Sequence, residues 1–244
     1  MVCHNRSISL PASSHPFVLK AEEELHKLKA QVGSRSLTCE IMLDTIKAVG
    51  HVYECINDLL CMPSNQNGLS HMQQRRLVDL ELEESIKLLD MCSTSRDNLN
   101  VIKYHVRDLE SAIRRGESEI IKSGVLFYNQ LVKKANKDVK KQVTRKSEAM
   151  AGDVPAIGLL LSETRDITTS LLHCVFSILL KQTESEKTGM WPLVSGLVQK
   201  RRIVCKKEIQ EDILDVVEAL EIGLESLFRQ MIQCRVSLLN ICCL

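Results

Sequence analysis

The chain has 244 residues, with 32 basic and 31 acidic side chains, 10 glycines and 5 prolines. Hydrophobic residues make up 44% and charged residues 26%, which excludes collagen-like, proline-rich and acidic disordered classes. So few turn-forming residues favour a small number of long elements over a many-stranded sheet. A net charge of +1 gives no overall attraction to nucleic acid or to anionic membranes, so any such attraction must be local.

The start of the chain reads as a leader followed by a helix. Residues 1–16 contain several serines and no acid, which weakly resembles a plastid transit peptide without its arginine-rich amphipathic pattern. We interpret them as a flexible leader. Residues 17–32 then place Phe17, Ala21, Leu25 and Leu28 on one side, up to Gly33. We expect this helix to dock on the rest of the protein, because an isolated helix of that length is marginal in water.

Two long helices with heptad-like spacing are predicted next. The first begins near residue 37, carries an apolar row and stops at Pro63 and a loop over residues 64–68; the row is Ile41, Ala48, Val52, Cys55, Leu59 and Met62. The second begins at a capping box formed by Ser70 and Gln73 and ends at Gly116, which is placed as a C-terminal cap.

The remaining chain predicts three more helices. A basic helix covers about 117–150, and an apolar helix covers about 155–181, which we expect to be central in a bundle. The last helix runs from about Pro192 to Cys243, and its apolar row alternates strictly between spacings of four and three: Ile213, Val217, Leu220, Leu224, Leu227, Met231, Cys234, Leu238 and Ile241. The predicted fold is all-α, an elongated antiparallel bundle of about five to six helices with coiled-coil-like packing, in one domain over residues 17–244.

No motif for catalysis, cofactor binding or metal binding is present. The glycines are widely spaced, so phosphate loops and dinucleotide fingerprints are excluded, and the seven histidines have no partner four residues away. No Cys-x-x-Cys pair occurs, and most of the ten cysteines lie in apolar helical patterns, as reduced core thiols do. We therefore predict a non-enzymatic protein without catalytic, cofactor-binding or metal-ligating residues, in a reducing compartment, the cytoplasm.

One basic run is a candidate surface for anionic headgroups or nucleic acid; it consists of Lys133, Lys134, Lys137, Lys140, Lys141, Arg145 and Lys146. Aromatic residues for base stacking are missing from it, so we expect no nucleic-acid partner. The alternative, which we favour, is internal compensation by an acidic stretch in the last helix: Glu211, Asp212, Asp215, Glu218, Glu221 and Glu225.

The last nine residues are nearly all apolar and include Cys242 and Cys243. A prenylation box would need a cysteine at position 241, where Ile241 stands. Two interpretations of this segment are therefore open: acylation of Cys242 or Cys243, or burial of the helix end in the protein. We favour burial.

Several blocks of the sequence resemble the plant BYPASS-type family. These are residues 6–11 (RSISLP), 53–60 (YECINDLL), 85–97 (SIKLLDMCSTSRD), 224–229 (LESLFR) and 235–240 (RVSLLN). The resemblance implies a plant protein of unknown biochemical activity linked to root and shoot development, and it implies no catalytic residues. Some family members are assigned to plastids, which the leader supports only weakly. The polar block 92–97 interrupts the heptads, and we expect it to pack against helix backbones rather than mark a partner site.

Three functions therefore compete. The first is a helical interaction or regulatory protein with a protein partner or self-association. The second is a peripheral membrane protein that uses the basic helix face. The third is an enzyme of small-molecule metabolism whose site is assembled from distant residues.

Overall fold

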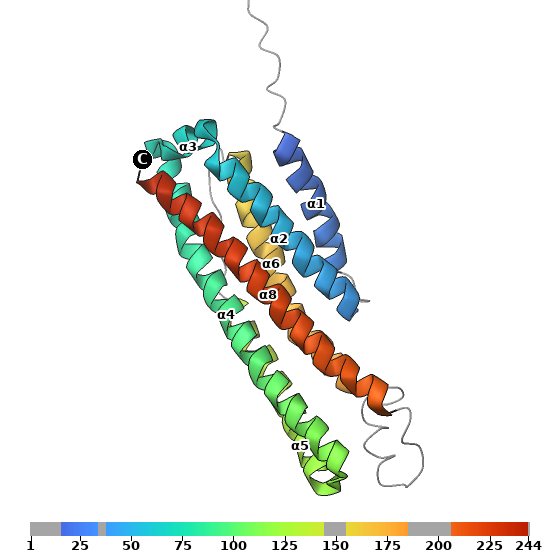
Figure 1. Cartoon of the computed structure of the whole chain (residues 1–244). Helices are drawn as coiled ribbons and strands as arrows, with labels where there is room; N and C mark the ends of the chain where they lie inside the picture. Colours follow the sequence, from blue (N-terminus) through green and yellow to red (C-terminus); the bar gives the residue numbers. More distant parts are fainter. Residues whose placement is uncertain (1–15, 34–37, 144–154, 185–205, 244) are drawn as a thin grey trace, which may run out of the picture.

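The computed structural model describes residues 16–33, 38–143, 155–184 and 206–243 (Figure 1). Every element in these ranges is a helix, as predicted: α1 (Pro16–Val32), α2 (Cys39–Cys61), α3 (Pro63–Ser70), α4 (Met72–Arg115), α5 (Ser118–Val143), α6 (Ala156–Glu184) and α8 (Lys206–Cys242). The described part has more helices than expected because the predicted loop after Pro63 is the short helix α3. Residues 1–15 of the leader, residues 144–150 of the basic helix and residues 192–205 of the last helix lie outside the described residues, and Pro16 is the first residue of α1.

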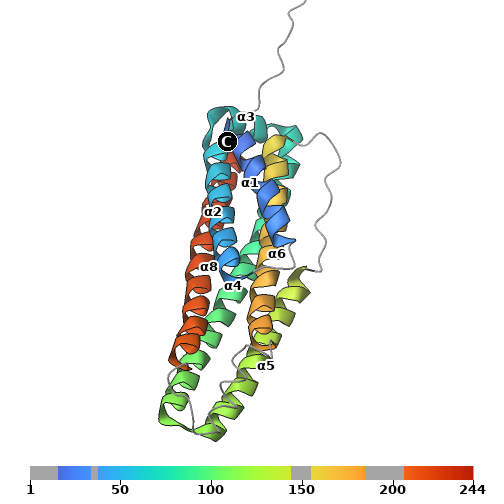
Figure 2. The same ribbon diagram turned by 90° about the vertical axis from the view of Figure 1, so that its right-hand side faces the viewer.

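The long helices form an elongated bundle in which successive helices run in opposite directions (Figures 1 and 2). The longest, α4, has 44 residues and is therefore about 66 Å long. It packs against α5 and α8, and α2 covers the other side of α8. Helix α6 packs against α1, α2, α4 and α5, which confirms its predicted central place. Helix α1 docks on α2 and α6 through buried Ala21, Leu25 and Leu28, although Phe17 is exposed.

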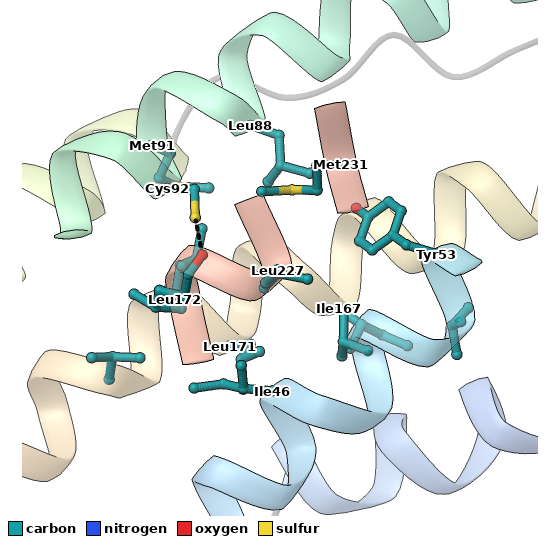
Figure 3. Packing of buried hydrophobic residues seen from close by; sticks show 14 of the residues in the cluster. Ile46, Tyr53, Leu88, Met91, Cys92, Ile167, Leu171, Leu172, Leu227 and Met231 are labelled. Carbon is teal, nitrogen blue, oxygen red and sulfur yellow. Dashed lines mark hydrogen bonds between the residues drawn. The ribbon is translucent and has the colours of Figure 1, made fainter. Parts of the chain in front are cut away.

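The predicted apolar row of α8 is the spine of the core. All nine of its members, from Ile213 to Ile241, are buried. Figure 3 shows two of them, Leu227 and Met231, among side chains from α2, α4 and α6. Fully burying side chains of this size contributes about 1.5–3 kcal/mol each relative to leaving them exposed, so this row is a major source of stability.

The predicted row of α2 is wrong in part. Val52 and Leu59 are buried as expected, but Ile41 is exposed and Ala48 is half-buried. The buried row is instead shifted by about one residue and consists of Met42, Ile46, Val49, Val52, Tyr53, Ile56, Leu59 and Leu60. Helix α2 packs against α1, α6 and α8 at once, so it needs a wide buried face rather than a narrow seam.

Helix ends follow local chemistry, with one error in the prediction. The hydroxyl of Thr38 accepts a hydrogen bond from the Ile41 amide at 3.3 Å and caps α2. The capping box at Ser70 is wrong, because this hydroxyl donates to the Asn67 carbonyl within α3 and His71 occupies the N-cap of α4. Gly116 ends α4 as predicted, in the left-handed conformation with φ 73° that favours glycine.

Candidate functional site

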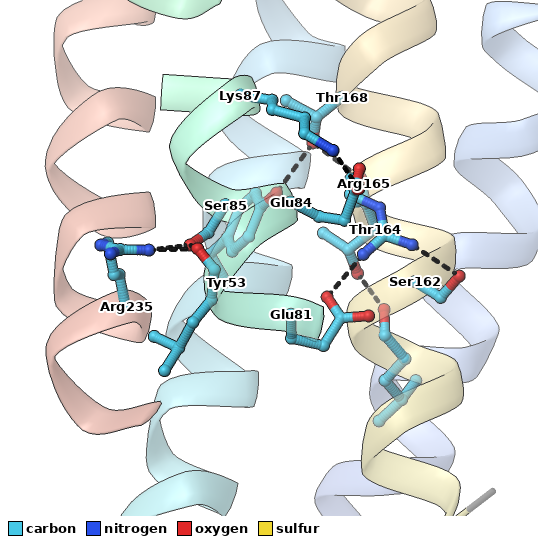
Figure 4. A network of polar contacts seen from close by, with 12 residues as sticks. Tyr53, Glu81, Glu84, Ser85, Lys87, Ser162, Thr164, Arg165, Thr168 and Arg235 are labelled. Atoms are coloured by element: carbon cyan, nitrogen blue, oxygen red, sulfur yellow. Dashed lines mark hydrogen bonds and ion pairs between the residues drawn. The ribbon is translucent and has the colours of Figure 1, made fainter. Parts of the chain in front are cut away.

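The four helices α2, α4, α6 and α8 enclose a polar cluster in the otherwise apolar bundle (Figure 4). Its members are Tyr53, Glu81, Ser85, Arg165, Thr168 and Arg235. At its centre Arg165 of α6 donates a hydrogen bond of 2.6 Å to the Glu81 carboxylate of α4, and both side chains are almost buried. Arg165 also donates to the Ser162 hydroxyl at 3.2 Å. Burial raises the pKa of Glu81 above its ordinary value, and the charge of Arg165 opposes the rise.

Two further contacts of the polar cluster join helices to one another. The Thr168 hydroxyl donates to the Thr164 carbonyl at 2.7 Å, so the Tyr53 hydroxyl is the donor in its 3.2 Å bond to Thr168. This bond connects α2 to α6. Arg235 of α8 donates to the Leu82 carbonyl and, at 2.6 Å, to the Ser85 hydroxyl of α4. The polar cluster therefore fixes the register of four helices.

The cluster borders a cavity of about 30 Å³, enough for an ordered water molecule but too small for a metabolite. A larger, open groove of about 430 Å³ lies between α1 and α6, lined by side chains that include His173 and Cys174. Burial raises the pKa of the Cys174 thiol, which keeps it protonated and poorly nucleophilic at neutral pH. Burial and the nearby charge of Lys140 lower the pKa of His173. Within the described residues, no group of three or more His, Cys, Asp or Glu side chains could hold a metal ion.

The predicted basic surface lies on the outer face of α5. Lys133, Lys134, Lys137, Lys140 and Lys141 are all exposed, whereas Arg145 and Lys146 lie outside the described residues. Lys141 pairs with Asp138 on its own helix.

The favoured explanation of this basic run, compensation by the acids of the last helix, is wrong for the lysines that the structure describes. Three of those acids pair instead with cations of α4, in the pairs Arg96–Glu225, Lys103–Glu221 and Arg107–Glu218. We call these pairs the α4–α8 ladder. Because α4 and α8 are antiparallel neighbours, the residue numbers rise along one side of the ladder and fall along the other.

The polar block at residues 92–97 packs as expected. The Cys92 thiol approaches the Leu224 carbonyl of α8 at 3.7 Å (Figure 3). Ser95 is buried and donates to the Met91 carbonyl, and Arg96 lies over the Phe228 ring, 4.8 Å from its centroid. The contacts of Cys92 and Arg96 hold α4 against α8, whereas the hydrogen bond of Ser95 lies within α4.

The two C-terminal cysteines differ in environment. Cys242 is half-buried, and its carbonyl accepts a hydrogen bond from Arg75 of α4, so the end of α8 is fastened to the start of α4. Cys243 is exposed. Burial raises the pKa of the Cys242 thiol. The predicted burial therefore holds in part for Cys242 and is wrong for Cys243.

One surface was missed by the sequence reasoning, and we call it the α8 outer face. Ile232, Val236 and Leu239 are 39–48% exposed although they lie on the same helix as the buried core row. Ile86 of α4 is also exposed and directly follows Ser85, the residue that Arg235 of α8 contacts. The sequence does contain a signal for this surface, because Ile232, Val236 and Leu239 form a second apolar row at spacings of four and three. Since this segment has apolar residues on all sides, the spacing does not reveal which row the core covers.

These features define an all-α protein: a long helical bundle with a closed core, a basic helix face and an exposed apolar face. None of the described helices combines the length and the apolar character that are needed to cross a bilayer. The chain belongs to the family described as Protein BPS1, whose model matches residues 46–219 and 209–241. This membership confirms the BYPASS-type resemblance. No curated protein and no solved structure gives a significant match to the chain.

Proposed function

We propose that the chain is a non-enzymatic interaction protein that receives an amphipathic helix of a protein partner, or of a second copy, on the α8 outer face. The observation that carries this proposal is the row of exposed apolar side chains on a helix whose opposite side already fills the core. Contiguous exposed apolar side chains on a folded surface are typical of interaction sites.

The geometry of the α8 outer face suits a helix. Ile232, Val236 and Leu239 follow one another at spacings of four and three, the pattern by which one helix packs along another. Ile86 is exposed on the neighbouring helix α4, one residue after Ser85, which Arg235 of α8 contacts, so the apolar surface extends toward α4. Arg229 and Glu225 form an ion pair next to this row on α8 and give it a polar border.

The family supports a regulatory role in plant development, in roots and shoots by the resemblance of the sequence blocks. The eight cysteines within the described residues are free thiols, which supports a reducing compartment. We therefore propose that the protein is cytoplasmic.

The test compares Val236→Asp with Leu19→Asp, a matched control that also adds a charge to an exposed apolar position, on α1, which packs against α2 and α6 and not against α8. Full-length proteins with equal melting temperatures are cross-linked in plant root extract and analysed by mass spectrometry, and light scattering measures self-association. We expect wild type and Leu19→Asp to share cross-links from the α8 outer face to a helical segment, and Val236→Asp to lose them. Identical cross-links in both variants, or none on this face in wild type, would refute the proposal.

A further inference from the structure

Helix α5 is an amphipathic helix at the edge of the bundle, and only its inner side is covered (Figure 2). The inner row packs against α4 and α6 and consists of Ile121, Val125, Tyr128, Val132, Ala135 and Val139, all buried. The outer side carries the five exposed lysines described above. A helix of this kind presents a cationic surface held at fixed geometry by a rigid bundle.

The positive charge of this face is not neutralised by the described part of the protein. None of the ion pairs among the described residues includes Lys133, Lys134, Lys137 or Lys140. Three of the six acids of α8 that could have compensated them are paired with Arg96, Lys103 and Arg107 in the α4–α8 ladder, and α8 packs mainly against α2 and α4 rather than α5. No ion pair with the described residues therefore competes with an external anion for these four lysines.

Exposed apolar side chains continue the lysine face along α5. Leu126 is 57% exposed and lies two turns before Lys133, and Phe127 is 49% exposed and lies two turns before Lys134. Residues seven apart share a helix face, so Leu126 points to the same side as Lys133. The Phe127 ring packs edge-on against the His105 ring of α4, with 4.9 Å between the centroids, and leaves its other half exposed beside Leu126. An acidic protein or a free polyanion would account for the lysines alone. A bilayer accounts for both groups, because lysines meet the headgroups while leucine and phenylalanine enter the boundary with the acyl chains.

We propose that the outer face of α5 docks on a bilayer rich in anionic headgroups. Lys133, Lys134, Lys137 and Lys140 contact the headgroups, while Leu126 and the exposed half of the Phe127 ring enter the boundary with the acyl chains. This inference does not depend on the helix-binding role of the α8 outer face, which lies on another helix. Each lysine near an anionic surface raises the partition into the membrane about fivefold.

Flotation with vesicles tests the proposal on the full-length protein. Vesicles of phosphatidylcholine with about a third of phosphatidylserine are compared with pure phosphatidylcholine, in low and in high salt. We expect binding to the anionic vesicles that weakens with salt, and little binding to the neutral ones. The variant K133Q/K134Q/K137Q/K140Q should bind about 100-fold more weakly or worse. The matched control K20Q/K47Q/R76Q/R114Q removes the same charge from exposed positions on α1, α2 and α4 and should bind more tightly than the α5 variant.

A second variant separates bilayer insertion from attraction to any polyanion. Leu126→Asn should weaken vesicle binding about tenfold, because it removes an apolar side chain that enters the bilayer in the bound state. It should leave the salt dependence unchanged, because it removes no charge. Circular dichroism confirms that the variants are folded. Equal binding of the two charge variants, equal binding to neutral vesicles, or competition by soluble inositol phosphate together with an unaltered Leu126→Asn variant would overturn the proposal.

Discussion

The ion pair between Glu81 and Arg165 shows what a polar residue does inside this bundle. It joins α4 to α6 at a level where Tyr53 of α2 and Arg235 of α8 also turn inward (Figure 4). Buried charges are costly unless they are paired, and here both partners are nearly enclosed. The ion pair fixes the relative alignment of α4 and α6, because it forms only when the two helices are in register. The sequence contains both residues but gives no sign that they meet, because 84 positions separate them.

Replacing Arg165 with methionine should lower the free energy of unfolding by about 3–5 kcal/mol at neutral pH, because the Glu81 charge is then buried without its partner. Burial already raises the pKa of Glu81, and losing Arg165 raises it further. The native state then binds the Glu81 proton more tightly than the unfolded state, so the variant gains stability relative to wild type as the pH falls from 7 towards 5. Urea unfolding at both pH values measures this difference.

The double variant Glu81→Leu/Arg165→Met is the control for that experiment. It removes both charges and should recover most of the lost stability, without the gain at acidic pH. If the double variant were as unstable as the single one, the loss would come from packing of the Arg165 side chain and not from the unpaired carboxylate.

Among the helices, the accuracy of sequence reasoning depended on how many neighbours a helix has. Helix α8 packs mainly against α2 and α4, so one row at spacings of four and three describes its buried side, and all nine positions were identified. Helix α2 has neighbours on three sides. Its apolar residues form overlapping rows, and spacing alone selected Ile41 instead of Met42.

Which helices lie side by side was also beyond the sequence. The acidic residues of α8 were recognised from the sequence. The spacing of Glu218, Glu221 and Glu225, however, would suit pairing with any basic helix, so it does not identify their partner. The bundle places them against α4, and so the α5 lysines are left for other contacts. The candidate lysine surface was therefore located by composition. The lack of ion pairs between Lys133, Lys134, Lys137 or Lys140 and the other described residues could be seen only from the topology.

The α4–α8 ladder predicts a charge-swap result. Replacing Glu221 with lysine should lower the free energy of unfolding by roughly 1 kcal/mol, because two like charges would then face each other. This value is at the upper end for surface ion pairs, since the side chains of Lys103 and Glu221 are largely shielded from water. The swap Lys103→Glu/Glu221→Lys should restore most of the loss. Chemical denaturation of the three proteins gives the values.

The matched control for the swap is Asp44→Lys, which reverses the exposed partner of Lys47 within α2 and should cost a few tenths of a kcal/mol. A swap no more stable than Glu221→Lys alone would mean that the ladder contributes no specific pairing between α4 and α8.

Across the whole bundle, burial is unevenly distributed. Most buried residues belong to one continuous core shared by the long helices. The far end of the α4–α5 hairpin extends beyond this core (Figure 1) and has a separate small cluster of Leu109, Ala112, Ile121 and Val125. Only α4 and α5 contribute to that cluster, so few contacts hold this end together.

Hydrogen exchange should therefore differ along the molecule. We expect amides of residues 109–125 to exchange faster than those of residues 220–234, which lie in the continuous core, because local opening of the hairpin end breaks fewer buried contacts. Mass spectrometry of peptides from the exchanged protein measures both segments in one experiment. Equal protection of the two would show that the hairpin end unfolds only together with the bundle.

The position of α8 in the chain has a consequence for biosynthesis. The ribosome makes α8 after α2 and α4, although its core row closes the space between them. In a nascent chain that has emerged only as far as α6, the apolar faces of α2 and α4 that α8 will cover are therefore exposed to water. Chaperones act on surfaces of this kind. A stop codon shortly before residue 206 would remove α8 and leave these apolar faces exposed permanently. The truncated protein would be prone to aggregation and would be a substrate for cellular quality control.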